Sequence, residues 1–262
     1  MTKQIAVVKI GGSTLGRNDT SLADLVALQH RNRRIIVVHG GGSEVSRWLS
    51  KMGLEARFIN GLRVTGGDEL SVVAAVLAGL INKRLVLMLN AAGGSAVGLS
   101  GVDGGLIEAR LKHPSLGYVG TITTVRAEVL HALLDKGMLP VVSPICWGIR
   151  DEEPTLFNVN ADDVAVQIAA AVEAELLVYL TDVPGIMDEN GDVFSRITAS
   201  QARDLVAAGT ISSGMVPKAL ACIEASQYVH EARIIDGTVE HALLHEFDRG
   251  TGGTSVVRDE LA

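Results

Sequence analysis

Short apolar stretches rich in β-branched residues alternate along this chain with longer amphipathic segments, and glycine clusters fall at many of the junctions. Residues 5–10 read as a buried strand, 11–13 as a turn, 22–28 as a helix and 35–38 as the next strand. Strands that alternate with helices in this way pair as a parallel sheet with helices on its faces. The pattern therefore predicts an α/β fold.

The alternation continues to the C-terminal end of the chain. Gly79 is a place where one predicted helix could break, and Ser43 is the expected N-cap of another. No internal repeat or low-complexity linker marks a boundary, so we expect two lobes, residues 1–174 and 175–262, on one continuous sheet. The further strands are predicted over residues 96–99, 106–109, 117–125, 139–145, 176–180 and 232–235, and the helices over 43–51, 70–90, 126–135, 161–174, 201–208 and 217–228.

Composition narrows the classes of function. Of the 262 residues 47% are apolar, which is too many for a disordered chain. The formal net charge of −7 argues against nucleic acid as a partner but leaves room for a local basic site for phosphate. The longest stretch without a polar side chain, residues 72–81, is shorter than the roughly 20 residues of a bilayer-spanning helix. We expect a soluble protein with no membrane partner.

The cysteines and the N-terminal residues indicate the compartment. Cys146 and Cys222 are far apart in the sequence, so neither a disulfide framework nor a Cys-x-x-Cys metal site can be built from them. The apolar residues 5–8 are too few for the hydrophobic region of a signal peptide. We therefore expect a cytoplasmic protein with two buried, reduced thiols.

Two glycine clusters follow the first two predicted strands. Lys9 precedes Gly11-Gly12, whose bare amides can approach an anion closely, although the spacing of a Walker A loop is absent. The alternative is a tight turn beside a solvated lysine. Residues 40–42 are three successive glycines at the carboxyl end of the second strand, where open parallel sheets bind ligands. His39 before them is better interpreted as a core histidine than as a base.

Polar residues elsewhere have both structural and functional interpretations. Arg63 could be a surface side chain, but its guanidinium also suits bidentate capture of a carboxylate. Asn160 is a good N-cap with Asp163 at the spacing of a capping box, which leaves Asn158 and Asp162 without a structural explanation.

The last third of the chain adds two segments. Residues 181–186 form a rigid turn directly after a strand. Lys218 lies at a helix N-terminus, where the helix dipole disfavours a cation, and this placement favours a functional role over a surface one.

Seven of these segments, in this order and spacing, resemble the motifs of the amino-acid kinase family. Within it the similarity is to the branch that phosphorylates the side-chain carboxylate of N-acetyl-L-glutamate in arginine biosynthesis. The resemblance covers essentially the whole chain and implies a three-layer αβα sandwich with a central, mostly parallel sheet, the carbamate kinase-like fold. The motifs are Lys9-Ile10-Gly11-Gly12, His39-Gly40-Gly41-Gly42, Asn60-Gly61-Leu62-Arg63-Val64-Thr65, Gly117-Tyr118-Val119-Gly120, Asn158-Val159-Asn160-Ala161-Asp162, Thr181-Asp182-Val183-Pro184-Gly185 and Gly214-Met215-Val216-Pro217-Lys218.

The resemblance also implies roles for the matching residues. Lys9 and Lys218 would contact the transferring phosphoryl group, and Asp162 would orient both lysines. The first lobe would bind the acyl amino acid through Gly41, Gly42, Arg63 and Asn158, and the second would bind ATP. The residues implied in phosphate and nucleotide binding are Gly11, Gly12, Asp182, Val183, Pro184, Gly185, Ile186, Met187, Thr210, Ile211 and Ser212.

Elementary chemistry agrees with these roles. Phosphoryl transfer between two anions needs positioning and cations, here two lysines and Mg²⁺, and no residue of the chain is assigned as a metal ligand. The nucleophile is a carboxylate that is already ionised at neutral pH, so no general base is needed.

The resemblance extends to assembly and leaves alternatives. Hexameric, arginine-inhibited members carry an additional N-terminal helix, and only four residues precede Ile5 here, so we expect a homodimer that arginine does not inhibit. A kinase of carrier-protein-linked aminoadipate or glutamate, from lysine biosynthesis, is the alternative enzyme. A catalytically silent sensor of nucleotide and amino acid is the alternative from another class, although it would not need Lys9, Asp162 and Lys218 together.

Overall fold

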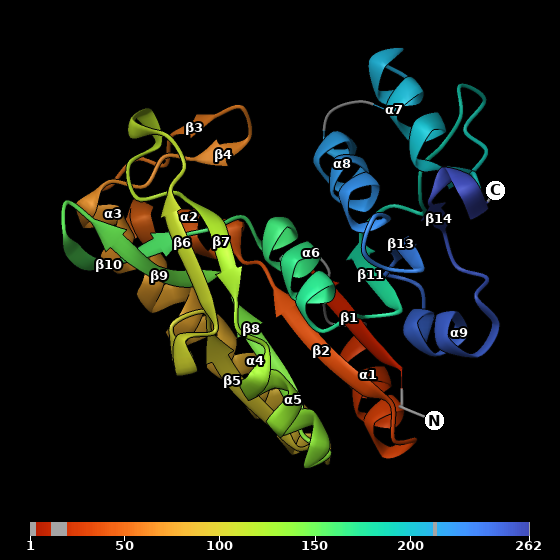
Figure 1. Ribbon diagram of the computed structural model, residues 1–262, viewed down its shortest axis with the longest axis horizontal. Coiled ribbons are helices and arrows are strands. Elements are labelled where there is room, and N and C mark those ends of the chain that lie inside the picture. Colours follow the sequence, from red (N-terminus) through yellow and green to blue (C-terminus); the bar gives the residue numbers. More distant parts are fainter. Residues whose placement is uncertain (1–3, 12–19, 212–213, 262) are drawn as a thin grey trace.

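An eight-stranded sheet runs through the centre of the molecule (Figure 1). The computed structural model describes residues 4–11, 20–211 and 214–261. Neighbouring strands are parallel except for one antiparallel pair, β13 with β14, so the predicted mostly parallel sheet is confirmed. In spatial order the strands are β12 (Arg196–Thr198), β14 (Thr254–Val257), β13 (Glu231–Asp236), β11 (Leu176–Thr181), β1 (Ile5–Ile10), β2 (Arg34–His39), β8 (Leu139–Ser143) and β5 (Ala96–Ser100).

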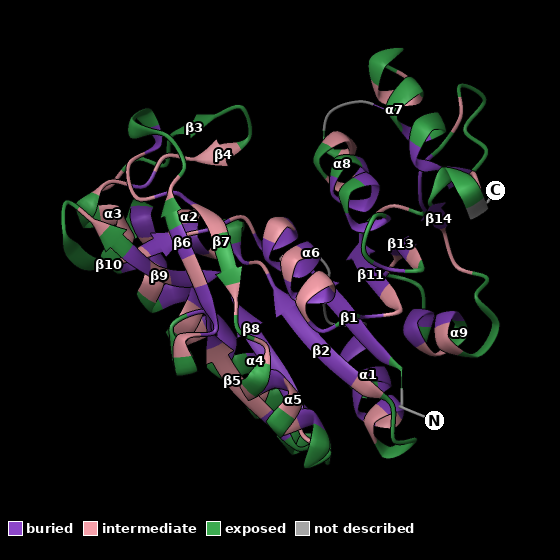
Figure 2. Cartoon of the chain, viewed as in Figure 1, coloured by how far each residue is buried: buried purple, intermediate pink, exposed green. Residues whose placement is uncertain are grey.

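Helices cover both faces of this sheet. Successive side chains of a strand point to opposite faces, so Val7 and Ile36 join one core cluster while Val8 and Ile35 join the other. The central strands are buried on both faces, as Figure 2 shows, and this explains their continuous apolar sequences. The predicted three-layer αβα sandwich is confirmed. One helical layer contains α5 (Glu128–Asp135), α6 (Ala161–Ala171), α7 (Ala199–Ala207) and α8 (Met215–Ala225), and the other contains α1 (Ser21–His30), α2 (Gly42–Lys51), α3 (Gly67–Ala74), α4 (Asn82–Ala91) and α9 (Ala242–Arg249).

The helix predicted over residues 70–90 does not break at Gly79. A π-helical segment, Ala75–Ile81, joins α3 to α4 and makes one helix from Gly67 to Ala91. By length and composition alone this helix could cross a membrane, yet its buried side chains pack in the same core cluster as strands β2 and β8. It is therefore a core helix of the sandwich.

A smaller sheet and a short hairpin extend from the carboxyl end of the large sheet. The strand predicted over residues 139–145 is wrong as a single element, because Pro144 separates β8 from a strand of the smaller sheet that begins at Ile145. Proline cannot donate to a ladder, which explains the change of sheet at this residue. The smaller sheet has the order β10 (Glu153–Asn158), β9 (Ile145–Arg150), β6 (Ile107–Leu111) and β7 (Gly120–Val125), and the hairpin pairs β3 (Phe58–Ile59) with β4 (Leu62–Arg63).

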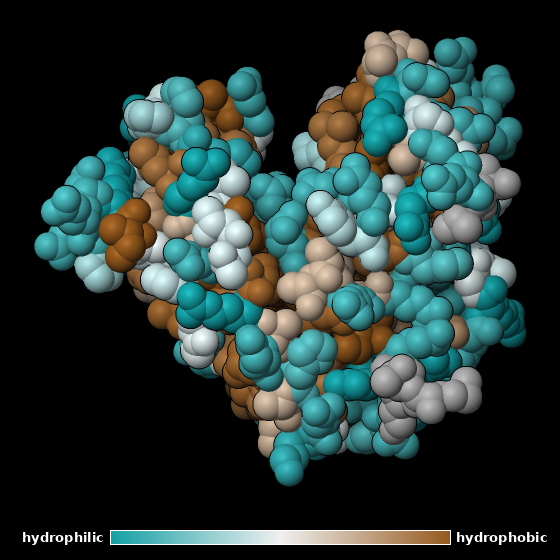
Figure 3. All heavy atoms as spheres, in the orientation of Figure 1, coloured by the Kyte–Doolittle hydropathy of each residue, from teal (hydrophilic) through white to brown (hydrophobic). Residues whose placement is uncertain are grey.

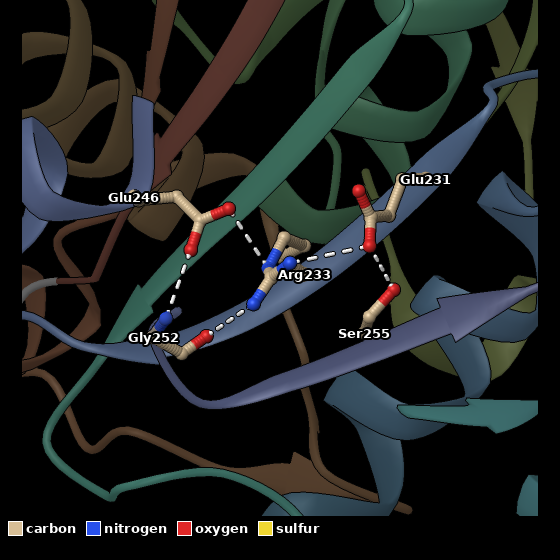
Figure 4. A network of polar contacts seen from close by, with 5 residues as sticks. All are labelled: Glu231, Arg233, Glu246, Gly252 and Ser255. Atoms are coloured by element: carbon tan, nitrogen blue, oxygen red, sulfur yellow. Dashed lines mark hydrogen bonds and ion pairs between the residues drawn. The ribbon is translucent and has the colours of Figure 1, made fainter. Parts of the chain in front are cut away.

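A buried ionic network fixes α9 to the sheet at the end opposite these additions (Figure 4). Arg233 on β13 lies 2.9 Å from the carboxylate of Glu246 on α9 and 3.2 Å from that of Glu231. Its Nη2 donates to the carbonyl of Gly252 at 2.8 Å, and Glu231 also accepts from the hydroxyl of Ser255. Glu231 lies on β13 itself, Glu246 on α9, and Gly252 and Ser255 at the start of β14 or just before it, so the network joins these three elements.

We predict that Arg233→Met lowers the free energy of unfolding by about 3–5 kcal/mol, because it leaves the carboxylate of Glu246 buried without its cation. The matched control is Arg31→Met, which also breaks a pair with α9. The side chains of Arg31 and Asp248 are 49% and 50% exposed, so this loss is expected to be at most about 1 kcal/mol. Chemical denaturation measures both values, and equal losses would contradict the role given to burial.

Candidate active site

A cavity of about 350 Å³ opens at the carboxyl ends of β1 and β2. Figure 3 shows the molecule hollowed between the half that carries β3 and β4 and the half that carries α7 and α8. Residues from eight separate parts of the sequence line it. The carboxyl ends of the strands are where open parallel sheets bind ligands. All seven residues predicted as catalytic or substrate-binding are among them: Lys9, Gly41, Gly42, Arg63, Asn158, Asp162 and Lys218.

Lys9 and Asp162 form a buried ion pair in this cavity. Lys9 is on the central strand β1, and Asp162 is in the first turn of α6, where the helix dipole favours an anion. Nζ lies 2.6 Å from Oδ1, and the two side chains are only 10% and 12% exposed. The pair places an ammonium group at the cavity wall in a fixed position.

Lys218 reaches the same cavity from α8. Its Nζ donates a hydrogen bond of 3.2 Å to the carbonyl of Gly214, one turn earlier. In the part of the chain that the structure describes, Asp162 is paired with Lys9 and makes no ion pair with Lys218. The structure thus brings both lysines to one cavity, and the expected contact of Asp162 is present for one of them.

The glycine loop after β2 becomes the N-terminus of α2. The helix begins at Gly42 with Gly41 as its N-cap, so the expectation that Ser43 would be the cap is wrong. Free backbone amides at a helix N-terminus are suited to binding anions. Arg63 braces this turn from β4, because its Nη2 donates to the carbonyl of Gly42 at 2.8 Å and to Oγ of Ser46 at 2.7 Å.

Arg63 is carried on the hairpin of β3 and β4, which the sequence analysis did not predict. An Asn60-Gly61 turn joins the strands with φ of 50° and 78°, the left-handed values of a tight hairpin turn. The Asn-Gly pair was the signal that could have found it. The guanidinium of Arg63 lies 4.7 Å from the ring of Phe58, and partial burial lowers its pKa. Its Nη1 has no hydrogen-bond partner among the described residues, so a donor remains for a carboxylate.

The polar residues before α6 divide into structural and site residues. Asn160 caps the helix as predicted, since its side chain accepts from the amide of Asp162 at 3.2 Å. Asp163 does not complete a capping box and instead lies 3.3 Å from Nζ of Lys112. Burial raises the pKa of Asp163, and Lys112 partly offsets this effect. Asn158, at the end of β10, lines the cavity.

None of the described residues assigned to nucleotide binding lines this cavity. Asp182, Pro184 and Met187 are exposed after β11, whereas Ile186 and Ile211 are buried in the core. The amide of Ile186 donates to Oγ1 of Thr254 and that of Ile211 to the carbonyl of Leu205, so neither amide is free for a ligand. The other described residues assigned to phosphate and nucleotide binding are Gly11, Val183, Gly185 and Thr210. Gly12 and Ser212 lie outside the described residues.

His39 is a core histidine, as expected. It is 1% exposed, and burial lowers its pKa to about 4, so the ring is neutral at physiological pH. Nδ1 donates to the carbonyl of Gly40 at 2.9 Å, and Nε2 accepts from the side-chain amide of Asn82 at 3.2 Å. The ring therefore stabilises the glycine loop through its hydrogen bond to Gly40 and does not line the cavity.

Comparison with known proteins identifies the family. The sequence profile described as "Amino acid kinase family" matches residues 4–236. The chain belongs to the amino acid kinase family. Among the relatives of this kinase are proteins named "Acetylglutamate kinase". The relative from Dehalococcoides mccartyi is 42% identical, and the match covers 100% of this chain and 97% of the relative. The relative from Thermosynechococcus vestitus is 44% identical, and the match covers 95% of this chain and 87% of the relative.

Solved structures show the same fold. The smu.665 protein of Streptococcus mutans superposes on this amino acid kinase with a TM-score of 0.84, at 28% identity over 98% of this chain and 100% of that one. The carbamate kinase of Giardia lamblia, bound to AMP-PNP, superposes with a TM-score of 0.74 at 14% identity, over 98% and 99% of the two chains. This second similarity confirms the expected carbamate kinase-like fold.

The environment of His39 gives this kinase a predictable dependence of stability on pH. The unfolded state binds a proton below the ordinary pKa of 6.5, whereas folded His39 binds one only near its lowered pKa of about 4. Neutral His39 therefore contributes fully to the free energy of unfolding above pH 6.5. This contribution, about 3 kcal/mol in total, is lost as the pH falls from 6.5 toward 4. Unfolding free energies measured across this range should fall more steeply for the wild type than for His39→Gln. Parallel curves would show that His39 titrates normally.

Proposed function

We propose that this chain transfers the γ-phosphoryl group of ATP to the side-chain carboxylate of N-acetyl-L-glutamate, giving N-acetyl-L-glutamyl 5-phosphate and ADP in arginine biosynthesis. The observation that carries the proposal is the gathering of the Lys9–Asp162 pair, Lys218 and Arg63 around one cavity. Relatives that share 42–44% of its residues over nearly the whole chain are named for this activity, which supports the choice of acceptor.

The reaction opposes two anions, and the cavity offers cations where they meet. A carboxylate oxygen attacks the γ-phosphorus, a new phosphorus–oxygen bond forms, and the bond to the oxygen bridging to the β-phosphate breaks as ADP leaves. Lys9 and Lys218 would face the oxygens of the transferring group and offset its charge. Lys9 can hold that position because Asp162 fixes its ammonium group at 2.6 Å.

The acceptor would bind in the half of the cavity near the hairpin. Arg63 retains the unpaired donor Nη1 for its α-carboxylate, and Asn158 supplies an amide beside it. The amides of Gly41 and Gly42, at the N-terminus of α2, would face the reacting carboxylate. That carboxylate is ionised at neutral pH, so the neutral ring of His39 is compatible with a reaction that uses no base.

ATP would lie between this cavity and the segments after β11 and α7. We assign its contacts to the exposed residues of 182–187, to Thr210 and to the glycines after Lys9, and residues 175–262 would form most of its lobe. Among the described residues, no three or more His, Cys, Asp or Glu side chains are grouped so that they could hold a metal ion. This composition fits Mg²⁺ that is held mainly by the phosphate oxygens of ATP and neutralises part of their charge.

We also propose a cytoplasmic homodimer. Cys146 and Cys222 are both free and buried, which is compatible with a reducing compartment.

Leu87 and Met88 on α4 are 68% and 53% exposed and offer an apolar surface for a second copy. The net charge of −7 supports the expectation that nucleic acid is not a partner.

Trapping the product tests the reaction directly. Purified protein is incubated with ATP, Mg²⁺ and hydroxylamine, which converts an acyl phosphate to a hydroxamate, and is offered N-acetylglutamate, free glutamate or N-acetylaminoadipate in turn. We expect hydroxamate from N-acetylglutamate alone. No hydroxamate from any acceptor would contradict the proposal and would leave the carrier-linked kinase and the silent sensor as the alternatives.

Replacing either lysine should affect the kinetics differently from replacing Arg63. Lys9→Ala and Lys218→Ala are each expected to lower kcat by about 10²–10³ with smaller effects on KM, because they act on the transferring group. Arg63→Ala should chiefly raise KM for the acceptor. Steady-state kinetics with each substrate varied would distinguish these cases, and a wild-type kcat in either lysine variant would remove that lysine from the reaction.

A further inference from the structure

Thr65 lies between the two residues that we assign to the acceptor, although it does not line the cavity itself. It follows β4 by two residues and is 0% exposed. Its Oγ1 lies 3.1 Å from Nδ2 of Asn158 and 3.3 Å from the carbonyl oxygen of Arg63. One buried hydroxyl therefore connects the strand that carries Arg63 with the end of the strand that carries Asn158.

The chemistry of the three groups fixes the direction of both hydrogen bonds. Nδ2 of an asparagine can only donate and a backbone carbonyl can only accept, whereas a hydroxyl can do both. Oγ1 of Thr65 must therefore accept from Asn158, and its own proton is directed to the carbonyl of Arg63. No apolar side chain of the same shape could take this place.

This arrangement determines which atoms Asn158 can offer to a ligand. With one N–H bound to Thr65, the amide retains its Oδ1 and a second N–H. In the described part of the chain, no hydrogen bond to Oδ1 is present, and Asn158 lines the cavity. Without the hydroxyl nothing in this contact would distinguish the two ends of the amide, and the group could turn over.

The backbone around Thr65 gives a use to the Gly117–Gly120 motif, which the reaction itself does not explain. The amide of Tyr118 donates to the carbonyl of Thr65 at 2.6 Å, and the amide of Asn158 donates to the carbonyl of Tyr118 at 2.9 Å. Gly117 has φ of 70°, and a Cβ there would lie 2.2 Å from the carbonyl oxygen of Thr65. The segment is thus a strap that sets the distance between Thr65 and Asn158.

We propose that Thr65 is a positioning residue, whose hydroxyl holds the side-chain amide of Asn158 in the orientation that binds the acceptor. The proposal rests on the proposed function for the identity of that acceptor. It assigns the effect of Thr65 to acceptor affinity rather than to phosphoryl transfer, since among the described residues Thr65 makes no hydrogen bond to Lys9, Asp162 or Lys218.

The first test replaces Thr65 with two residues that separate shape from hydrogen bonding. Thr65→Val keeps the shape and loses the hydroxyl, and we expect KM for the acceptor to rise about tenfold, with kcat and KM for ATP within about twofold of wild type. Thr65→Ser keeps the hydroxyl and should restore KM. Thr123→Val is the matched control, because that exposed threonine also donates to a carbonyl, that of Glu108, outside the cavity.

A double-mutant cycle shows whether Thr65 acts through Asn158. If it does, Thr65→Val raises KM little further in an Asn158→Ala background, because the amide that it positions is gone. Full additivity of the two changes would overturn the proposal, as would an unchanged KM in Thr65→Val or a high KM in Thr65→Ser.

A second measurement needs no acceptor, so it can also be made on a variant that phosphorylates none of the acceptors offered. The side-chain amide signals of Asn158 in a ¹H–¹⁵N spectrum, assigned by their loss in Asn158→Ala, should move in Thr65→Val and stay in place in Thr65→Ser. Unmoved signals in folded Thr65→Val would contradict the hydrogen bond. A wild type that gives no hydroxamate would instead count against the proposed reaction, and the spectrum would still decide the role of Thr65.

Discussion

The buried ion pair between Lys9 and Asp162 joins the central strand of the sheet to the helix beside it, and the rest of the site is arranged around it. Lys9 is on β1, flanked by β2 and β11, so its backbone is fixed on both sides. Asp162 gains its place from the cap that Asn160 provides to α6. A cation held this way does not need to reorganise when a polyanion arrives, which is the condition under which electrostatic catalysis is effective.

The fold contains a second buried ionic group, and the contrast explains what each is for. At the opposite end of the sheet, Arg233 forms ion pairs with Glu231 and Glu246 and donates a hydrogen bond to the carbonyl of Gly252. Such a closed network fixes neighbouring elements and leaves little for a ligand. Lys9 has three N–H donors and one carboxylate partner among the described residues, so it can contribute to both the fold and a phosphoryl group.

The sequence predicted the parts of the site that follow directly from strand ends and failed where contacts depend on distant pairing. Lys9 and the glycines at 40–42 could be placed because the carboxyl ends of parallel strands meet at one edge. The pairing of Lys112 with Asp163 joins positions 51 residues apart, and no local sequence pattern predicts it. Pro144 was assigned to the end of one strand, although the chain passes there into a second sheet. The Asn60-Gly61 turn had a recognisable signal, and only its two-residue strands concealed the hairpin.

In the proposed reaction, the two halves of the cavity would meet different physical demands. Near Lys9 and Lys218 the requirement is positive charge at a place where negative charge gathers, and side chains from a strand and a helix supply it. Near Arg63 the requirement is orientation, because the acceptor carboxylate is reactive without activation and needs only to point at phosphorus. Backbone contacts meet this second demand: the carbonyl of Gly42 holds Arg63, and the strap through Tyr118 holds the strand end of Asn158. Geometry on one side and charge on the other therefore divide the work of a reaction that needs no proton transfer to begin.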